Sequence, residues 1–253
     1  MRSIARAALA LLFIVSASCS GIRQPTPLGV GERWSLRFAD EFTGNSVDWK
    51  KWRDTSSAER DDGHGNPDNQ QLEWNQAQNC SVKDGRMTIT AKPDSITSPS
   101  GRHYHWSSCL ISSTYNFRYG FIEERAKFPS AAGFWAAFWT WQAPGSDTNS
   151  EVDAYESYSD NPRTLHLRHP DSDKECVHRL PFDPTTSFHI YGVDIEPDGI
   201  RWYIDGQKVC ETAATASGPS SIIDDMFVYS KIPPEPGAVE HKSIDYIRAW
   251  QHP

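Results

Sequence analysis

The sequence predicts an all-β protein in which two antiparallel sheets pack face to face, as a sandwich of the jelly-roll kind. From Trp34 onward, short segments of alternating apolar and polar residues are separated by glycine, proline, asparagine and aspartate. This pattern is typical of strands joined by turns. The sequence has no long apolar stripe at helical spacing and no internal repeat. Many antiparallel strands with long connections favour two packed sheets.

The first residues differ in character from the rest of the chain. Arg2 and Arg6 precede an apolar run over residues 7–15, and three small residues, 16–18, come just before Cys19. This arrangement predicts a signal peptide over residues 1–18. A transmembrane anchor is the weaker alternative, because the apolar run is shorter than the roughly 20 residues that cross a bilayer.

Cleavage before Cys19 leaves two destinations open. The chain is either secreted or lipid-anchored at the cell surface through Cys19, since lipoprotein signals end in a small residue followed by cysteine. In both cases residues 19–33 form a short linker to one domain over residues 34–253. Cleavage removes two of the 25 basic residues and none of the 33 acidic ones, which leaves a formal charge near −10. A chain this acidic is not expected to bind nucleic acid or anionic lipid.

Six segments have the clearest strand character: residues 86–91, 119–128, 134–141, 151–157, 164–168 and 189–195. A hairpin is expected between residues 200–204 and 207–211, because Asp205-Gly206 supplies the positive φ angles of a tight turn. Two polar stretches, residues 61–71 and 143–150, are too long for plain hairpin turns. Loops of this length often carry function, although they can also be simple surface excursions.

Strand alternation divides the aromatic residues of segment 134–141 between two faces. Trp135, Trp139 and Trp141 share one face, and Phe134 and Phe138 lie on the other. Sugar rings stack their flat C–H faces on aromatic rings, so a row of tryptophans can line a glycan-binding cleft. The alternative is that all five side chains belong to the core.

Three acids, Glu151, Asp153 and Glu156, fall within six residues of an expected strand. In a regular strand Glu151 and Asp153 share a face and Glu156 points the other way. A one-residue bulge after Asp153 would turn all three into one cleft. Retaining glycoside hydrolysis requires one ionised carboxylate as nucleophile and one protonated carboxyl as acid. The alternative is an acidic, solvent-exposed strand face.

Four cysteines remain after cleavage, namely Cys80, Cys109, Cys176 and Cys210. An even number in an exported chain favours disulfides. Three pairings are possible, and we expect Cys80 with Cys109 and Cys176 with Cys210, because each pair would join neighbouring segments. A structural zinc is not expected, since the sequence has no CxxC pair and no histidine at zinc-finger spacing.

Residues 151–156, Glu-Val-Asp-Ala-Tyr-Glu, resemble the ExDxxE signature of the family 16 glycoside hydrolases in its β-bulge form. Further blocks resemble the family in family order: residues 40–42, 48–52, 69–74, 120–127, 188–191, 201–206 and 245–248. The resemblance runs from about Phe38 to Trp250. It implies a concanavalin-like β-jelly roll and a family 16 catalytic domain over residues 34–253.

The resemblance also implies roles for individual residues. Glu151 would be the nucleophile, Glu156 the general acid/base and Asp153 their assistant. No cofactor is expected for catalysis, but a structural calcium is implied at Glu41 and Asp245, either of which could instead be a surface acid. The residues expected to bind substrate are Trp135, Trp139, Trp141, Asn69, Glu73, Arg125 and His166.

The laminarinase-like branch matches best, which implies a retaining, endo-acting hydrolase that cleaves β-1,3 or mixed β-1,3/1,4 glucan by double displacement. The enzyme is expected to be a monomer. One departure keeps agarase-like galactan hydrolysis open, because residues 227–234 replace an Asn-Leu-Ala-Val-Gly-Gly-like segment of that branch. Sulfated galactans are less expected, since the one obvious basic cluster is Arg163, Arg168 and His169. A glycan-binding protein without activity and a transglycosylase are the remaining alternatives.

Overall fold

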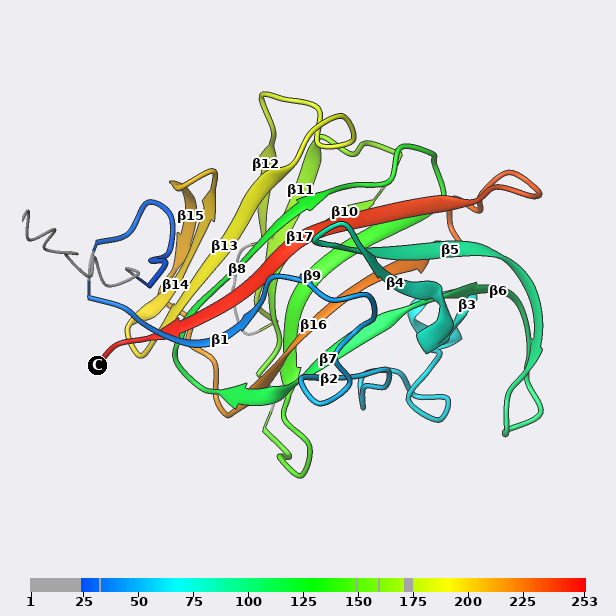
Figure 1. The fold of residues 1–253 in the computed structure, drawn as a ribbon, viewed down its shortest axis with the longest axis horizontal. Helices are drawn as coiled ribbons and strands as arrows, with labels where there is room; N and C mark the ends of the chain where they lie inside the picture. The colour runs from blue at the N-terminus through cyan, green and yellow to red at the C-terminus, as the bar shows by residue number, and fades with distance from the viewer. Residues whose placement is uncertain (1–23, 32, 149, 159, 171–174) are drawn as a thin grey trace, which may run out of the picture.

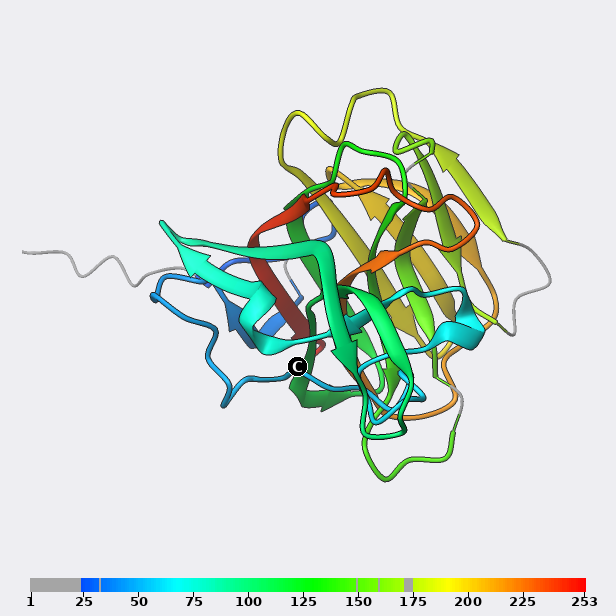
Figure 2. The same ribbon diagram turned by 90° about the vertical axis from the view of Figure 1, so that its right-hand side faces the viewer.

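The computed structural model describes residues 24–31, 33–148, 150–158, 160–170 and 175–253. The expected signal peptide and Cys19 lie outside these residues. The prediction of an all-β sandwich is confirmed, and Figures 1 and 2 show its two layers of strands. The strands are β1 (Ser35–Asp40), β2 (Trp52–Arg53), β3 (Glu73–Asn75), β4 (Cys80–Lys83), β5 (Arg86–Thr97), β6 (His103–Ser108), β7 (Leu110–Phe117), β8 (Gly120–Lys127), β9 (Phe134–Gln142), β10 (Val152–Tyr158), β11 (Thr164–Arg168), β12 (Cys176–Arg179), β13 (His189–Glu196), β14 (Gly199–Ile204), β15 (Gln207–Thr212), β16 (Ser220–Val228) and β17 (Glu240–Gln251), with the short 3-10 helices η1 (Pro67–Asn69) and η2 (Ala77–Asn79).

The strands form two sheets that differ in their role. One sheet, which we call the cleft sheet, has the order β12-β11-β10-β9-β16-β7-β2. The other, the outer sheet, has the order β15-β14-β13-β8-β17-β5-β6-β3, with β1 beside β17 and β4 beside β5. In Figure 1, β17 of the outer sheet runs diagonally across the view. The hairpin between β14 and β15 turns at Asp205 and Gly206, which both have positive φ as expected.

The two layers are joined by apolar packing and by two disulfides. Phe134 and Phe138 point from β9 into the core between the sheets, as strand alternation predicts. Both expected cysteine pairings are present. The Cys176–Cys210 disulfide joins β12, an edge strand of the cleft sheet, to β15, an edge strand of the outer sheet. This covalent bond therefore fixes one open side of the sandwich.

A buried ionic cluster lies between the sheets behind β10. The Lys242 side chain has no exposed surface, and its Nζ donates to Asp224 Oδ1 at 2.5 Å and to the Ala137 carbonyl at 2.8 Å. Glu124 Oε1 lies 3.5 Å from the same nitrogen and accepts a hydrogen bond from the Tyr155 hydroxyl. The cluster thus links β17 and β8 of the outer sheet to β16, β9 and β10 of the cleft sheet.

We predict that Lys242→Met lowers the free energy of unfolding by about 3–5 kcal/mol, because it leaves buried carboxyl groups without their cation. Urea unfolding at neutral pH measures the change. Lys208→Met is the matched control, since Lys208 forms an exposed pair with Glu211 and its loss should change stability by less than about 1 kcal/mol. Equal effects of the two substitutions would contradict the prediction.

Candidate active site

The bulge expected after Asp153 is present in β10. Along the pairing with β9, Asp153 lies opposite Trp139 and Tyr155 lies opposite Phe138. Ala154 is therefore an extra residue between two adjacent partners on β9, both of which the structure describes. Because Trp139 faces the cleft side and Phe138 faces the core, the bulge changes which residues of β10 point outward.

Beyond the bulge, Glu156 lies opposite Ala137 and Tyr158 lies opposite Trp135. Ala137 and Trp135 belong to the cluster on the cleft side of the sheet. Glu156 and Tyr158 consequently share the face of Asp153, which an unbroken strand would not allow for a residue three positions away.

Contacts on both sides of β10 hold the bulge in place. From the outer sheet, Trp202 Nε1 donates to the Asp153 carbonyl at 2.7 Å and so satisfies a backbone acceptor at the bulge. From β9, the Thr140 hydroxyl accepts a hydrogen bond from the Val152 amide at 3.0 Å. The same hydroxyl donates to the Ser150 carbonyl at 3.1 Å. These bonds fix the backbone on both sides of Glu151.

The three acids face a cleft of about 860 Å³. A second hollow of about 320 Å³ adjoins it, because Glu151 and Asn69 line both. A third hollow of about 410 Å³ lies on the other side of Trp141 and shares Glu59 with the second. The cleft therefore continues in one direction beyond the acids. The first hollow is lined by the three acids with Trp135, Tyr158, His166, Arg168, Tyr229 and Lys231, among others.

Five of the seven expected substrate-binding residues line this cleft: Trp135, Trp139, Trp141, Asn69 and His166. Trp135 and Trp139 are mostly buried and present only part of their rings, at 5% and 7% exposure. Trp139 Nε1 donates to Asp225 at 3.0 Å, and Trp141 Nε1 donates to Ser57 at 3.1 Å. These bonds fix the orientation of the two rings along the cleft.

The other two expected residues, Glu73 and Arg125, are not among the described residues that line the cleft, which corrects that expectation. Glu73 is fully buried on β3, where its carboxylate accepts the Val228 amide at 2.7 Å. Arg125 is on β8 of the outer sheet, where it pairs with Asp245 at 2.6 Å and lies over the Phe188 ring.

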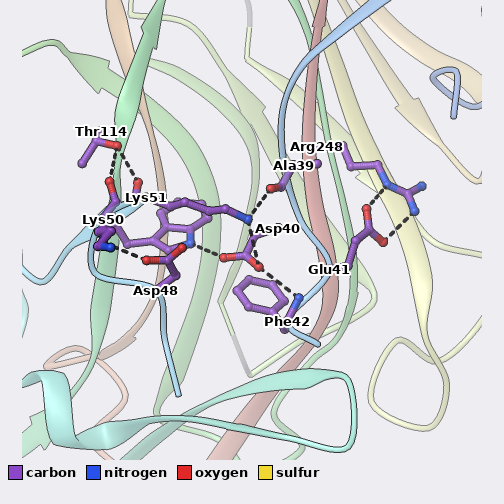
Figure 3. Close-up of polar contacts among 10 residues, drawn as sticks. Ala39, Asp40, Glu41, Phe42, Asp48, Lys50, Lys51, Thr114 and Arg248 are labelled. Atoms are coloured by element: carbon purple, nitrogen blue, oxygen red, sulfur yellow. Dashed lines mark hydrogen bonds and ion pairs between the residues drawn. The ribbon is translucent and has the colours of Figure 1, made fainter. Parts of the chain in front are cut away.

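The residues expected to hold calcium do not fit a calcium site. Glu41 is bound through both oxygens by Arg248, with Nε at 2.7 Å and a terminal nitrogen at 2.8 Å (Figure 3). Asp245 is paired with Arg125 and lies 4.0 Å from Arg86. Calcium requires six to eight oxygen ligands, and these two carboxylates are already neutralised by arginine. Among the residues that the structure describes, no group of three or more acidic, histidine or cysteine side chains is placed to bind a metal.

The environment of each of the three carboxyl groups raises its pKa. Burial raises the pKa of Glu156 to about 7, against the lowering effect of Arg168 and of the Tyr158 hydroxyl bonded to it at 3.1 Å. Burial and the negative charges of Glu156 and Glu151 raise the pKa of Asp153 well above its ordinary value. Burial also raises the pKa of Glu151, which Arg168 opposes. The low-dielectric cleft therefore favours protonated forms of these groups.

The cleft is also lined by residues that were not expected to bind substrate, among them Tyr158, Arg168, Glu175 and Tyr229. Strand alternation could have indicated two of them, since Tyr158 follows Glu156 by two residues and Arg168 follows His166 by two. Glu175 and Tyr229 reach the cleft only through long-range packing. The Tyr229 ring contacts the rings of Trp135 and Tyr158 at centroid distances of 5.4 and 5.2 Å.

A two-sheet sandwich with carboxyl groups on a bulged strand beside a tryptophan-lined cleft is the architecture of a glycoside hydrolase. The sequence profile described as "Glycosyl hydrolases family 16" matches residues 66–232. The chain belongs to this family, and the resemblance deduced from residues 151–156 is confirmed.

Two curated relatives are 30% identical to the chain. Endo-1,3-1,4-beta-glycanase EglC of Rhizobium meliloti (strain 1021) matches over 187 residues, 67% of this chain and 39% of the relative. Glucan endo-1,3-beta-glucosidase A1 of Niallia circulans matches over 227 residues, 76% of this chain and 32% of the relative. The chain thus spans 39% and 32% of the length of these two relatives. The catalytic domain of an endo-1,3-beta-glucanase from Thermotoga petrophila RKU-1 has the same fold, with a TM-score of 0.76 at 24% identity, covering 88% of this chain and 99% of that one.

Glu73 gives a prediction about stability and pH. Burial raises its pKa from 4.5 to about 7, so the folded protein binds more protons than the unfolded chain between these values. The contribution of Glu73 to the free energy of unfolding is fully present below pH 4.5 and is lost as pH rises through 7. We predict that Glu73→Gln, which keeps an acceptor for the Val228 amide, reduces the pH-dependent loss of stability by on the order of 2 kcal/mol.

Thermal unfolding of both proteins between pH 4.5 and 8 measures this effect. The fall in Tm should be smaller for Glu73→Gln than for the wild type, and the exposed Glu235→Gln serves as control. Parallel curves for the wild type and Glu73→Gln would show that Glu73 does not retain its proton in the folded state.

Proposed function

We propose that the chain is a retaining, endo-acting hydrolase of β-glucan with β-1,3 or mixed β-1,3/1,4 linkages. The observation that carries this proposal is the bulge in β10, which puts Glu151, Asp153 and Glu156 on one face beside a tryptophan-lined cleft. Family membership and the glucan-cleaving activities in the names of the two 30% identical relatives support it.

In this proposal the two glutamates divide the chemistry of double displacement. Glu151 attacks the anomeric carbon, while Glu156 transfers its proton to the leaving oxygen and later removes a proton from the attacking water. A pKa of about 7 suits Glu156 to both steps, because it is protonated in weak acid and can still lose its proton. Asp153 retains its proton more strongly than an ordinary aspartate and can donate a hydrogen bond to an ionised neighbour.

The shape and charge of the cleft support an extended, neutral substrate. The hollows on either side of Trp141 offer room for several sugar rings in line with the acids, which fits cleavage within a chain. Trp139 and Trp141 supply apolar faces, and Asn69 and Asn66 supply amides for hydroxyl groups. The acidic chain, with a formal charge of −8 before any cleavage, disfavours polyanions.

A galactan is the second candidate substrate, because the cleft wall formed by residues 227–234 departs from the laminarinase-like branch. Tyr229 of this wall lines the cleft and packs edge-on against Trp135, and Lys231 adds a cation to the lining. A wall of this kind can select a different sugar ring without changing the catalytic groups.

We further propose that the protein is exported and acts as a monomer, either secreted or anchored by lipid at Cys19. The predicted signal peptide and the two disulfides support export, since disulfides persist in oxidising compartments. None of the described residues forms a helix that is long and apolar enough to cross a membrane.

We predict that Glu151→Ala and Glu156→Ala each lower kcat by about 10²–10⁴-fold or more, whereas Asp153→Asn loses less. Azide distinguishes the two roles. In Glu151→Ala it should attack from the vacated side and give the α-glycosyl azide, and in Glu156→Ala it should give the β-glycosyl azide. NMR of the products identifies the anomer, and Glu211→Gln, an exposed acid on β15, is the control. Near-wild-type turnover by either alanine variant would refute the assignment.

Initial rates on laminarin, barley mixed-linkage glucan, agarose and carrageenan test the substrate. We expect the two glucans to be cleaved, with oligosaccharides of several lengths released early because the enzyme acts within the chain. Preference for agarose or carrageenan would favour the galactan alternative. Binding to a glucan with no release of reducing ends would identify a glycan-binding protein instead.

A further inference from the structure

A chain of polar contacts runs from Glu156 to Glu175, at the edge of the cleft sheet. One terminal nitrogen of the Arg168 guanidinium lies 3.3 Å from Glu156 Oε2. Its Nε and its other terminal nitrogen both lie 2.7 Å from Glu175 Oε1. His166 Nδ1 is 2.5 Å from the same Glu175 oxygen. The guanidinium therefore makes its short contacts with Glu175 and its long contact with Glu156.

The backbone fixes the position of both partners. Arg168 and His166 are on β11, where they lie opposite Asp153 and Glu156 of β10. Glu175 directly precedes Cys176, which pairs with Leu167 in the β11–β12 ladder and forms the disulfide with Cys210. The carboxylate of Glu175 is thus held beside Arg168 by a strand whose own position is covalently fixed.

We infer that Glu175 is a positioning residue, which holds Arg168 away from a full ion pair with Glu156 and so leaves Glu156 able to carry the catalytic proton. This inference rests on the proposed function of Glu156. A guanidinium can bind one carboxylate through two parallel hydrogen bonds, and such a pair strongly favours the ionised carboxylate. Arg168 does not pair with Glu156 in this way, because its Nε and one terminal nitrogen both contact a single oxygen of Glu175 and Glu156 receives one longer contact.

Several charged and titratable groups surround Glu156. Those that face it or line the same hollow among the described residues are Glu151, Asp153 and Tyr158 of β10, His166 and Arg168 of β11, Glu175, Asp160, His169, Tyr229 and Lys231. Of the described carboxylates, Glu175 and Glu156 are the two within 4.0 Å of the Arg168 guanidinium. Loss of the Glu175 carboxylate therefore frees Arg168 to pair with Glu156, and this pairing lowers the pKa of Glu156.

We predict that Glu175→Gln moves the alkaline limb of the kcat/KM profile on laminarin to lower pH by about half to one unit. Arg168→Gln should move the same limb to higher pH, because it removes the cation that opposes protonation of Glu156. The double variant should follow Arg168→Gln, since Glu175 acts through Arg168. Glu211→Gln neutralises an exposed carboxylate next to the same disulfide and should leave the profile unchanged.

A titration without substrate separates this inference from the proposed function. In protein labelled with ¹³C at the glutamate carboxyl, the Glu156 signal is the one lost in Glu156→Gln, and its midpoint should shift in the same directions as the kinetic limb. Such shifts support the inference even if laminarin is not cleaved. An unmoved midpoint in Glu175→Gln, or additive shifts in the double variant, would overturn it.

Discussion

The cleft depends on one extra residue in β10. A regular strand alternates its faces every residue, so two glutamates five positions apart cannot both face the same side. Ala154 breaks this alternation, and the Trp202 indole satisfies the carbonyl of the preceding residue from the opposite sheet. The geometry of the catalytic strand is therefore set by both layers of the sandwich. Loss of the Trp202 indole would leave the Asp153 carbonyl at the bulge without this hydrogen bond.

The bulge has a consequence on the inner face of the same strand. It turns Tyr155 into the core, where its ring packs against Phe128 and Tyr191 and its hydroxyl needs an acceptor. Glu124 provides that acceptor, and Lys242 supplies the positive charge for both Glu124 and Asp224. The buried ionic cluster is thus the counterpart of the cleft acids on the other side of one strand. The ion pairs and hydrogen bonds of Lys242 and Tyr155 within the sandwich offset part of the cost of burying these groups.

Local sequence patterns predicted the parts of the fold that depend on local rules. Alternation separated Trp135 and Trp139 from Phe138, and the spacing of the acids indicated the bulge. Arg125 could not be placed in this way, because alternation gives the face of a strand but not the sheet to which it belongs. The pairing of β8 with β17 and β13 decides that question, and it joins segments far apart in the sequence. The prediction that Glu73 binds substrate was wrong for a related reason. Glu73 is buried by the parallel pairing of β3 with β6, which a local pattern does not reveal.

The same burial that equips the cleft for acid catalysis also weakens the protein as pH rises. Three further acids, Glu59, Glu73 and Asp225, are buried, and burial raises the pKa of each. The negative charge of Glu73 further raises the pKa of Glu59, and that of Glu59 raises the pKa of Asp225. Ionising one of these groups therefore makes ionisation of the next more costly. Proton retention by Glu156 and by these three buried acids is greater in weakly acidic conditions, because burial raises the pKa of each group.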